Sequence, residues 1–377
     1  MVALPRSPVT VCHVLHSLKV GGAEVLAARL ARQLSGDFRV LFACLDELGT
    51  LGQQLRDDGF PVEVLGRRPG VDWRCVLRLA RLLRRERVDL VQAHQYTPYF
   101  YSAAARLLTP RAAVLLTEHG RHQPDYPRPK RKLANRLLLR RRDRVVAVGA
   151  AVRDALVAND GFPARRVEVI YNGIDLGPFA APRDDRRAVR REMGFGDDEF
   201  VILQVARLDY LKDHATAVRT LAEVIPQRPD ARLVIVGEGP ELGAIQEVVR
   251  QNRLEGQVRF LGLRKDVARL LWGADLFLLT SISEGIPLTV IEAMAAGLPV
   301  VSTRVGGLPE VIEEGRMGLL EPARDHVALG RAVCRLAADP ALRREMGRLG
   351  RERAESVFSE PQMHAGYVRL YREMLHD

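Results

Sequence analysis

The run SEGIPLTVIEAMAAGLPVVST, residues 283–303, decides the fold. It follows the apolar run Leu276–Leu279 and ends in a second one, Pro299–Ser302, which predicts strand, turn, short helix, turn and strand. Glu284 and Glu292 stand eight residues apart in this segment. Ionised carboxylates accept hydrogen bonds from hydroxyl groups, and a helix N-terminus offers N–H groups to a phosphate. The segment therefore indicates a hydroxyl-rich ligand that carries phosphate.

Short β-branched runs alternate with longer amphipathic stretches along the rest of the chain, which predicts parallel, doubly wound sheets. A stretch rich in Pro, Gly and Asp at 171–187 interrupts the alternation and is expected to be a linker. Because 377 residues exceed the usual size of one hydrophobic core, we expect domains over 1–175 and 176–360. The expected strands are Val9–Leu15, Arg39–Cys44, Val62–Leu65, Asp89–Ala93, Ala113–Thr117, Arg144–Val148, Val167–Ile170, Val201–Val205, Arg232–Val236, Val258–Phe260, Leu276–Leu279 and Pro299–Ser302.

Composition narrows the class of protein. The hydrophobic content of 47% and charged content of 28% are those of a globular protein. Residues 1–180 hold 29 Lys and Arg against 17 Asp and Glu, whereas residues 181–377 hold 28 against 30, and the two halves sum to the net charge of +10. A basic first half indicates an anionic surface or acceptor. The four cysteines lack metal-ligand spacing, no run is long enough to span a bilayer, and no signal peptide is evident, so a cytoplasmic location is expected.

Several polar motifs follow directly after expected strands. Open α/β sheets bind ligands beyond the carboxyl ends of their strands, so these motifs are predicted to gather at two sheet edges that face one cleft. A glycine pair stands at Gly21–Gly22, His119 follows Ala113–Thr117, and Arg207 with Lys212 follows Val201–Val205. A guanidinium and an ammonium so placed suit a pyrophosphate.

The run with Glu284 and Glu292 resembles the E-x7-E signature of retaining glycosyltransferases of family 4, which use nucleotide sugars and have the two-domain GT-B fold. Further motifs of that family appear in the same order along almost the whole chain. They are Gly21–Glu24, Thr117–Gly120, Asn172–Asp175, Arg207 with Lys212, Gly237–Pro240 and Val305–Glu310. The resemblance implies two Rossmann-like domains facing a central cleft, with the C-terminal helix, 361–377, packed back on the first domain.

The resemblance also implies roles for single residues. His119 is expected to bond the donor sugar near the reacting carbon, and Arg207 and Lys212 to neutralise the departing diphosphate. Glu284 is expected to accept bonds from sugar hydroxyls and Glu292 to bind the ribose. The other expected donor-binding residues are Gly21, Gly22, Gly237, Glu238, Leu263, Gly285, Ile286, Leu288 and Thr289. No metal or other cofactor is expected, because no Asp-x-Asp motif and no ligand cluster occur in the sequence.

Each of these motifs also has a plain structural explanation. A double glycine also serves a tight turn, and a single histidine is often a satisfied structural residue. Arg207 and Lys212 can form solvated ion pairs with Asp209 or Asp213, and such pairs contribute only ~0–1 kcal/mol. For Glu292, a solvated helix face is the simple alternative, although its neighbours are apolar.

The segment from Arg128 to Arg144 carries nine Lys and Arg against the single acid Asp143. Interleaved leucines predict a basic amphipathic helix, which can lie on anionic lipid or be an arginine-rich solvated face. No aromatic stacking surface or known motif accompanies the charge, so nucleic acid is not an expected partner.

Together with the resemblance, these observations predict a glycosyltransferase that moves a hexose from a nucleotide sugar at the inner face of the cell membrane. Retention of configuration and UDP rather than GDP as the nucleotide are what the resemblance implies. The expected acceptor is a lipid-linked or cell-envelope saccharide. Two alternatives stay open from the sequence. One is a non-catalytic nucleotide-sugar-binding or membrane adaptor with the same fold, and the other is an epimerase or a phosphorylase. None of the five lysines sits in a recognisable pyridoxal phosphate context.

Overall fold

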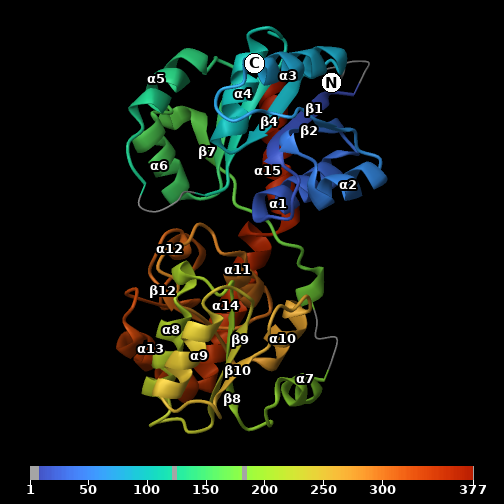
Figure 1. Ribbon diagram of the computed structural model, residues 1–377. Helices are drawn as coiled ribbons and strands as arrows, with labels where there is room; N and C mark the ends of the chain where they lie inside the picture. Colours follow the sequence, from blue (N-terminus) through green and yellow to red (C-terminus); the bar gives the residue numbers. More distant parts are fainter. Residues whose placement is uncertain (1–7, 121–124, 181–184, 377) are drawn as a thin grey trace. The chain divides into compact units, whose positions relative to one another are not determined.

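The computed structural model describes residues 8–120, 125–180 and 185–376, which form two compact units (Figure 1). Unit 1 contains the described residues up to Tyr171 together with those from Met363 onward, and unit 2 contains those between Asn172 and Gln362. Each unit is built around its own parallel sheet with helices on both faces. The predicted fold class of two Rossmann-like parallel-sheet domains is therefore confirmed.

Unit 1 holds a seven-stranded sheet in the order β3-β2-β1-β4-β5-β6-β7, and all its pairings are parallel. Every residue of β4 and β5 is buried, as expected for strands covered on both faces. The strands are β1 (Thr10–Ser17), β2 (Arg39–Glu47), β3 (Val62–Val64), β4 (Leu90–His94), β5 (Ala113–Glu118), β6 (Arg144–Ala147) and β7 (Val167–Val169).

Helices cover both faces of this sheet. On one face, α1 and α15 pack over residues such as Val11, Leu15 and Leu115; on the other, α3 and α4 pack over Cys12 and Val14. The helices of unit 1 are α1 (Gly22–Leu34), α2 (Gly49–Asp57), α3 (Trp73–Arg85), α4 (Tyr96–Arg106), α5 (Pro129–Leu138), α6 (Ala150–Asp160) and, from Met363 on, α15 (Glu360–His376).

The end of α15 is held on unit 1 by polar contacts as well as by apolar packing. The Tyr371 hydroxyl donates to the Gln92 side-chain oxygen in the buried face of the sheet. The Arg142 guanidinium donates to the carbonyl oxygens of Met374 and Leu375 at 3.2–3.4 Å. Figure 1 shows this C-terminal helix, in red, among the blue and teal elements of unit 1.

Unit 2 holds a six-stranded parallel sheet in the order β10-β9-β8-β11-β12-β13. Its strands are β8 (Phe200–Val205), β9 (Ala231–Val236), β10 (Val258–Phe260), β11 (Leu276–Leu279), β12 (Val300–Thr303) and β13 (Gly318–Glu321). Its helices are α7 (Arg186–Met193), α8 (His214–Val224), α9 (Leu242–Gln251), α10 (Val267–Gly273), α11 (Leu288–Ala295), α12 (Leu308–Val311), α13 (His326–Ala338) and α14 (Pro340–Val357).

Two sequence predictions need correction. All twelve expected strands are present; β10 and β11 have the expected ends, and the others differ by one to three residues at an end. β13 was missed, because Gly-Leu-Leu-Glu contains no β-branched or aromatic residue. The basic helix expected over 128–144 is shorter: α5 ends at Leu138, and β6 begins at Arg144. None of the helices in the described ranges is long and apolar enough to cross a membrane.

Candidate active site

In unit 2, two glycines allow the backbones of the loops after β8 and β9 to pack closely against each other. A Cβ atom on Gly237 would lie 2.0 Å from the Ala206 carbonyl oxygen, and one on Gly239 would lie 2.1 Å from that of Leu208. The Leu208 amide donates to the Glu238 carbonyl at 2.9 Å. Because both contacts are with backbone, neither glycine can carry a side chain without a shift of the loop.

The loop after β8 is also hydrogen-bonded to the loop after β11. β11 lies next to β8 in the sheet. The Ile282 amide donates to the Leu211 carbonyl at 2.9 Å. The buried Thr280 hydroxyl donates to the Asp213 carbonyl at 2.8 Å. These bonds bring Lys212 beside the residues that follow β11.

The loop after β12 contacts the loop after β11 at the carboxyl ends of the strands. Gly307 donates its amide to the Gly285 carbonyl at 3.1 Å, and Gly306 has a φ of +52°. A Cβ atom on Gly306 would lie 1.8 Å from the Glu284 carbonyl oxygen. Glycine at this position therefore fixes the backbone that carries Glu284.

We expect Gly306→Ala to disturb unit 2 more than a glycine replacement that meets only backbone strain. Gly315 is the matched control, because its φ is +76° and no described atom lies within 4 Å of a Cβ placed on it. Gly315→Ala is expected to cost about 1 kcal/mol of stability, and Gly306→Ala about 2 kcal/mol more, because the backbone near Glu284 must move. Urea unfolding read from Trp272, with Trp73 replaced by Phe, measures the difference. Equal losses in the two variants would contradict the steric argument.

Lys212 and Glu284 form the central contact of this edge. Lys212 Nζ lies 2.6 Å from Glu284 Oε1, and the side chain of Glu284 is only 7% exposed. The Ser281 hydroxyl donates to the same Glu284 oxygen at 2.6 Å. Two donors on one oxygen of a nearly buried carboxylate fix the orientation of the Glu284 side chain. The structure thus joins two predicted site residues that lie 72 positions apart in the sequence.

Arg207 is placed differently. Its side chain is 72% exposed, and Arg207 Nε lies 3.8 Å from Asp209 Oδ2, which is a weak surface pair. Its backbone is better held, because its carbonyl oxygen lies 3.1 Å from His214 Nε2. Arg207 therefore stands in the same loop as Lys212 without joining the Lys212–Glu284 pair.

The remaining predicted residues of unit 2 lie at the same strand ends or on α11. Gly285 and Glu292 are half-buried, Ile286 is buried, and Leu288 and Thr289 form the partly buried first turn of α11. Glu292 is carried by α11, whose neighbouring residues Val290, Ile291, Ala293 and Met294 are buried. Glu238 and Leu263 are exposed in the loops after β9 and β10.

In unit 1, three imidazoles form a continuous chain across adjacent strands. His13 Nδ1 lies 2.9 Å from His94 Nε2, and His94 Nδ1 lies 2.8 Å from His119 Nε2. The rings are stacked, with centroids 5.3 and 5.1 Å apart. Of these three residues, the sequence singled out His119; it missed His13, which lies inside an apolar strand and has no local signal.

Burial lowers the pKa of all three histidines. The pKa of His13 falls to about 3 and that of His119 to about 4, in both cases by desolvation of the charged form. Desolvation, followed by the charges of His119 and His13, holds the pKa of His94 well below its usual value. All three imidazoles are thus neutral at pH 7.

Gly21 and Gly22 start α1 directly after β1. Gly21 is the N-cap residue, and the Glu24 carboxylate lies over it, because a Cβ on Gly21 would be 2.4 Å from Glu24 Oε2. Gly22 has no described atom within 4 Å of such a Cβ. A ligand could therefore approach the backbone closely at Gly22, whereas at Gly21 that space is filled by the Glu24 carboxylate of α1.

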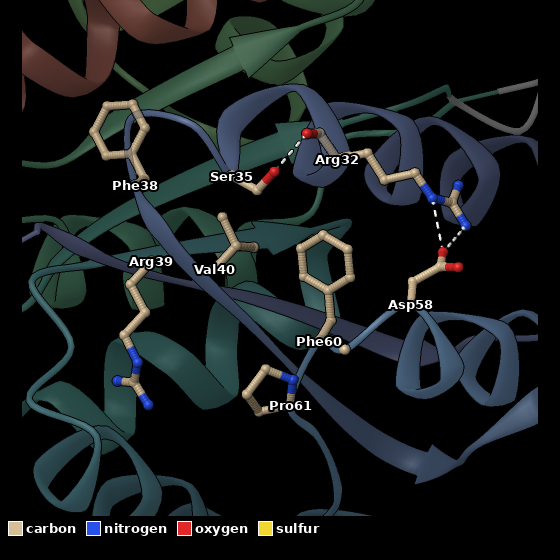
Figure 2. A pocket seen from close by; sticks show the side chains of 9 residues that line it. Arg32, Ser35, Phe38, Arg39, Val40, Asp58, Phe60 and Pro61 are labelled. Atoms are coloured by element: carbon tan, nitrogen blue, oxygen red, sulfur yellow. Dashed lines mark hydrogen bonds and ion pairs between the residues drawn. The ribbon is translucent and has the colours of Figure 1, made fainter.

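A hollow of about 600 Å³ in unit 1 lies away from these residues (Figure 2). Its lining includes Phe38, Arg39 and Phe60, which precede or begin β2 and β3, and the ion pair of Arg32 with Asp58 closes one side at 2.6 Å. The hollow is therefore at the amino ends of parallel strands. Ligands of open α/β sheets bind at the opposite edge, so it is not the candidate site.

Across residues 8–120, 125–180 and 185–376, the structure contains no group of three or more His, Cys, Asp or Glu side chains placed to hold a metal ion. The described cysteines are free thiols.

Comparison with solved structures gives the class of protein. A glycosyltransferase from Rickettsia africae is similar with a TM-score of 0.87 and 20% identity over 98% of this chain and 99% of its own. HepE of Anabaena in complex with UDP is similar with a TM-score of 0.85 and 22% identity over 97% and 100%. The same HepE has been solved with UDP-glucose. These likenesses, together with two Rossmann-like units, define a protein of the GT-B fold.

Sequence comparison gives the family. Residues 20–177 match the model described as Glycosyltransferase Family 4, and residues 185–353 match Glycosyl transferases group 1. The chain is 29% identical to N-acetyl-alpha-D-glucosaminyl L-malate synthase of Bacillus anthracis over 82% of its length and 81% of that protein. The chain belongs to glycosyltransferase family 4, within the group 1 glycosyltransferases. It is thus a glycosyltransferase rather than the adaptor, epimerase or phosphorylase that the sequence alone left open.

Proposed function

We propose that this glycosyltransferase moves a hexose from a nucleoside diphosphate sugar to an acceptor hydroxyl with retention of configuration, and that UDP is preferred over GDP. The observation that carries the proposal is the Lys212–Glu284 pair at 2.6 Å, held at a carboxyl sheet edge by glycine-locked loops. Such an edge supplies a cation, an acceptor carboxylate and free backbone amides in one place. The UDP-glucose complex of HepE supports the choice of nucleotide.

In the proposed reaction the bond between the anomeric carbon and the diphosphate oxygen breaks while the acceptor oxygen bonds the same face of that carbon. The acceptor proton passes to the departing phosphate. Lys212 and Arg207 stabilise the charge that develops on the diphosphate, and Glu284 accepts bonds from sugar hydroxyls. Glu292 binds the ribose, and the amides near Gly285, Ile286, Leu288 and Thr289 serve the diphosphate. His119 of unit 1 bonds the sugar, and no metal takes part.

A thermal-shift screen with UDP-, GDP- and ADP-sugars tests the donor. A ligand at about 100 times its Kd stabilises the protein by about 2.7 kcal/mol, so a bound UDP-sugar is expected to raise Tm by about 5–10 °C. GDP- and ADP-sugars are expected to give smaller shifts. A larger shift with a GDP-sugar would overturn the nucleotide preference, and silence across the whole panel would overturn the proposed function.

The proposed acceptor is a lipid-linked or cell-envelope saccharide at the inner face of the cell membrane. Support comes from the surface of α5 formed by Lys130, Leu133, Arg136 and Leu137, which we call the α5 surface. Leu133 is 62% and Leu137 75% exposed, and the two basic residues are exposed beside them. An apolar stripe flanked by basic side chains suits shallow insertion into anionic lipid. The +12 charge of residues 1–180 favours the same partner.

Vesicle co-sedimentation tests this surface. Each basic residue near an anionic membrane contributes about 1 kcal/mol, so Lys130→Ser with Arg136→Ser is expected to reduce binding to anionic phospholipid vesicles about thirtyfold at low salt. Leu133→Ser with Leu137→Ser should reduce binding that persists at high salt. Arg142 is left intact, because it bonds the carbonyls of α15.

The control for this experiment removes equal charge from unit 2. Arg250 and Arg316 are exposed and form ion pairs with Glu247 and Glu313 on their own helix or turn, so Arg250→Ser with Arg316→Ser should leave vesicle binding unchanged. Equal losses in the control and the α5 variants would mean that net charge alone, and not this surface, controls binding.

A further inference from the structure

The three histidines of unit 1 lie on a diagonal of the sheet. In the parallel register, His13 pairs with Gln92, and His94 stands two residues beyond Gln92 on β4. His94 in turn pairs with Thr117, and His119 stands two residues beyond Thr117. An offset of two residues keeps side chains on the same face, and it advances each step by about 6.6 Å along the strands. The three rings thus extend from the middle of β1 to the edge of the sheet at which the strands have their carboxyl ends, after β5.

The diagonal is on the face covered by α1 and α15, and its inner end is fully enclosed. His13 is 0% exposed, and its ring stacks on Phe42 with centroids 5.3 Å apart. His94 is 3% exposed. His119, at the outer end, follows β5 at the edge where ligands bind in such sheets.

The two hydrogen bonds force the three rings to share one tautomer. A neutral imidazole carries one N–H and one acceptor nitrogen, so His94 must donate from one nitrogen and accept at the other. If His94 donates from Nδ1 to His119, it accepts from His13 Nδ1, and the His119 proton is then on Nδ1. If the bonds run the other way, all three protons are on Nε2.

The unpartnered nitrogens of the first and last histidine, His13 and His119, decide between the Nδ1 and Nε2 tautomers. Within the described residues, His13 Nε2 and His119 Nδ1 are buried and have no hydrogen-bond partner. With protons on Nε2, His13 would bury an orphaned N–H donor, which is rare in folded proteins. With protons on Nδ1, His13 Nε2 is only an acceptor, and the unpartnered donor is His119 Nδ1, which is also buried but belongs to a half-buried residue at the sheet edge. A ligand oxygen at that position would accept the hydrogen bond that His119 Nδ1 has to donate.

We infer that His13 and His94 are positioning residues, which hold the proton of His119 on Nδ1 so that it donates to an oxygen of the bound nucleotide sugar. The inference rests on the proposed function for the identity of the ligand. The tautomer itself depends only on unit 1. His13 acts from two hydrogen bonds away and does not touch the substrate.

Long-range ¹H–¹⁵N NMR of histidine-labelled protein reads the tautomer directly, because protonated and bare ring nitrogens resonate far apart. We expect protonated Nδ1 and bare Nε2 at all three histidines in the free protein, and the same pattern with UDP-glucose bound. A His119→Asn spectrum assigns the outer ring. Protonated Nε2 at His119 would overturn the inference.

Two variants of His13 separate positioning from simple packing. His13→Phe keeps the stack on Phe42 but loses the bond to His94, whereas His13→Asn places an amide donor near the position of Nδ1. His13→Phe is expected to mix the tautomers of His119 and to lower kcat about tenfold, which equals the loss of about one hydrogen bond. His13→Asn should restore both the Nδ1 tautomer and most of kcat.

The outcomes separate the two proposals. An unchanged His119 tautomer in His13→Phe would overturn the positioning role, whatever the activity. Failure of every nucleotide sugar to bind in the thermal screen would overturn the proposed function and the ligand named here, while the spectrum of the free protein still decides the tautomer. The wild-type spectrum needs no variant, so poor folding of His13→Phe does not remove the test.

Discussion

Lys212→Ala is expected to lower kcat about a hundredfold or more, with a smaller change in donor KM. The ammonium that is removed would stabilise charge on the departing diphosphate, and loss of one such donor costs about 3 kcal/mol of barrier. The change also removes one of the two side-chain donors described for the nearly buried Glu284 carboxylate, and the Ser281 hydroxyl remains. Steady-state kinetics with UDP-glucose, or with whichever donor the thermal screen selects, measures the effect.

Two companion variants make this result interpretable. Arg316→Ala removes a cation of the same unit from an exposed pair with Glu313 and should leave kcat unchanged. Glu284→Gln removes the carboxylate charge, so the double variant with Lys212→Ala gives the coupling between the two residues. If kcat of Lys212→Ala stays within threefold of wild type while Tm is unchanged, Lys212 does not stabilise the leaving group.

The stability of unit 1 is expected to fall steeply between pH 7 and pH 5. His13 and His119 have folded pKa values of about 3 and about 4, and that of His94 is also lowered, whereas unfolded histidine titrates near 6.5. Between these values the unfolded chain binds more protons than the folded one, so the free energy of unfolding falls as pH falls. The stabilisation is fully present above about pH 6.5. Each histidine contributes a slope of up to about 1.4 kcal/mol per pH unit, or about 4 kcal/mol for three.

Urea unfolding at several pH values tests this slope. Trp272→Phe leaves Trp73 as the single tryptophan, so its fluorescence reports unit 1. His13→Phe should reduce the slope by about one histidine's share, and His376→Asn, which changes an exposed residue at the end of α15, should not. A stability that is flat from pH 7 to pH 5 would mean that the three imidazoles are not held neutral in the folded protein.

The histidine chain and the Lys212–Glu284 pair belong to different units but arise in the same way. Both include polar side chains where parallel strands end, such as His94 and Glu284, and glycine or strand register fixes their approach. Lys212→Ala and His13→Phe therefore test separate halves of the proposal.

The sequence determined the class of fold, because burial on both faces of a parallel sheet imposes continuous apolar runs that are visible locally. It also placed His119, Lys212 and Glu284 at strand ends, since strand boundaries follow from the same runs. It failed at β13, whose composition is not that of a strand, and at the end of α5. Both depend on residues farther away in the sequence: β13 pairs with β12, and Asp143, which accepts from the Arg140 amide after α5, is itself held by Arg106 and the Val114 amide.

Only the tertiary structure decided which of these residues meet. The contact of Lys212 with Glu284 depends on β8 and β11 being neighbours, and the role of Gly306 depends on the loop after β12 lying against Glu284. His13 enters the histidine chain only because the register of β1, β4 and β5 sets a two-residue step from strand to strand. Strand order and register are set by packing across the whole sheet, so no local pattern in the sequence encodes them.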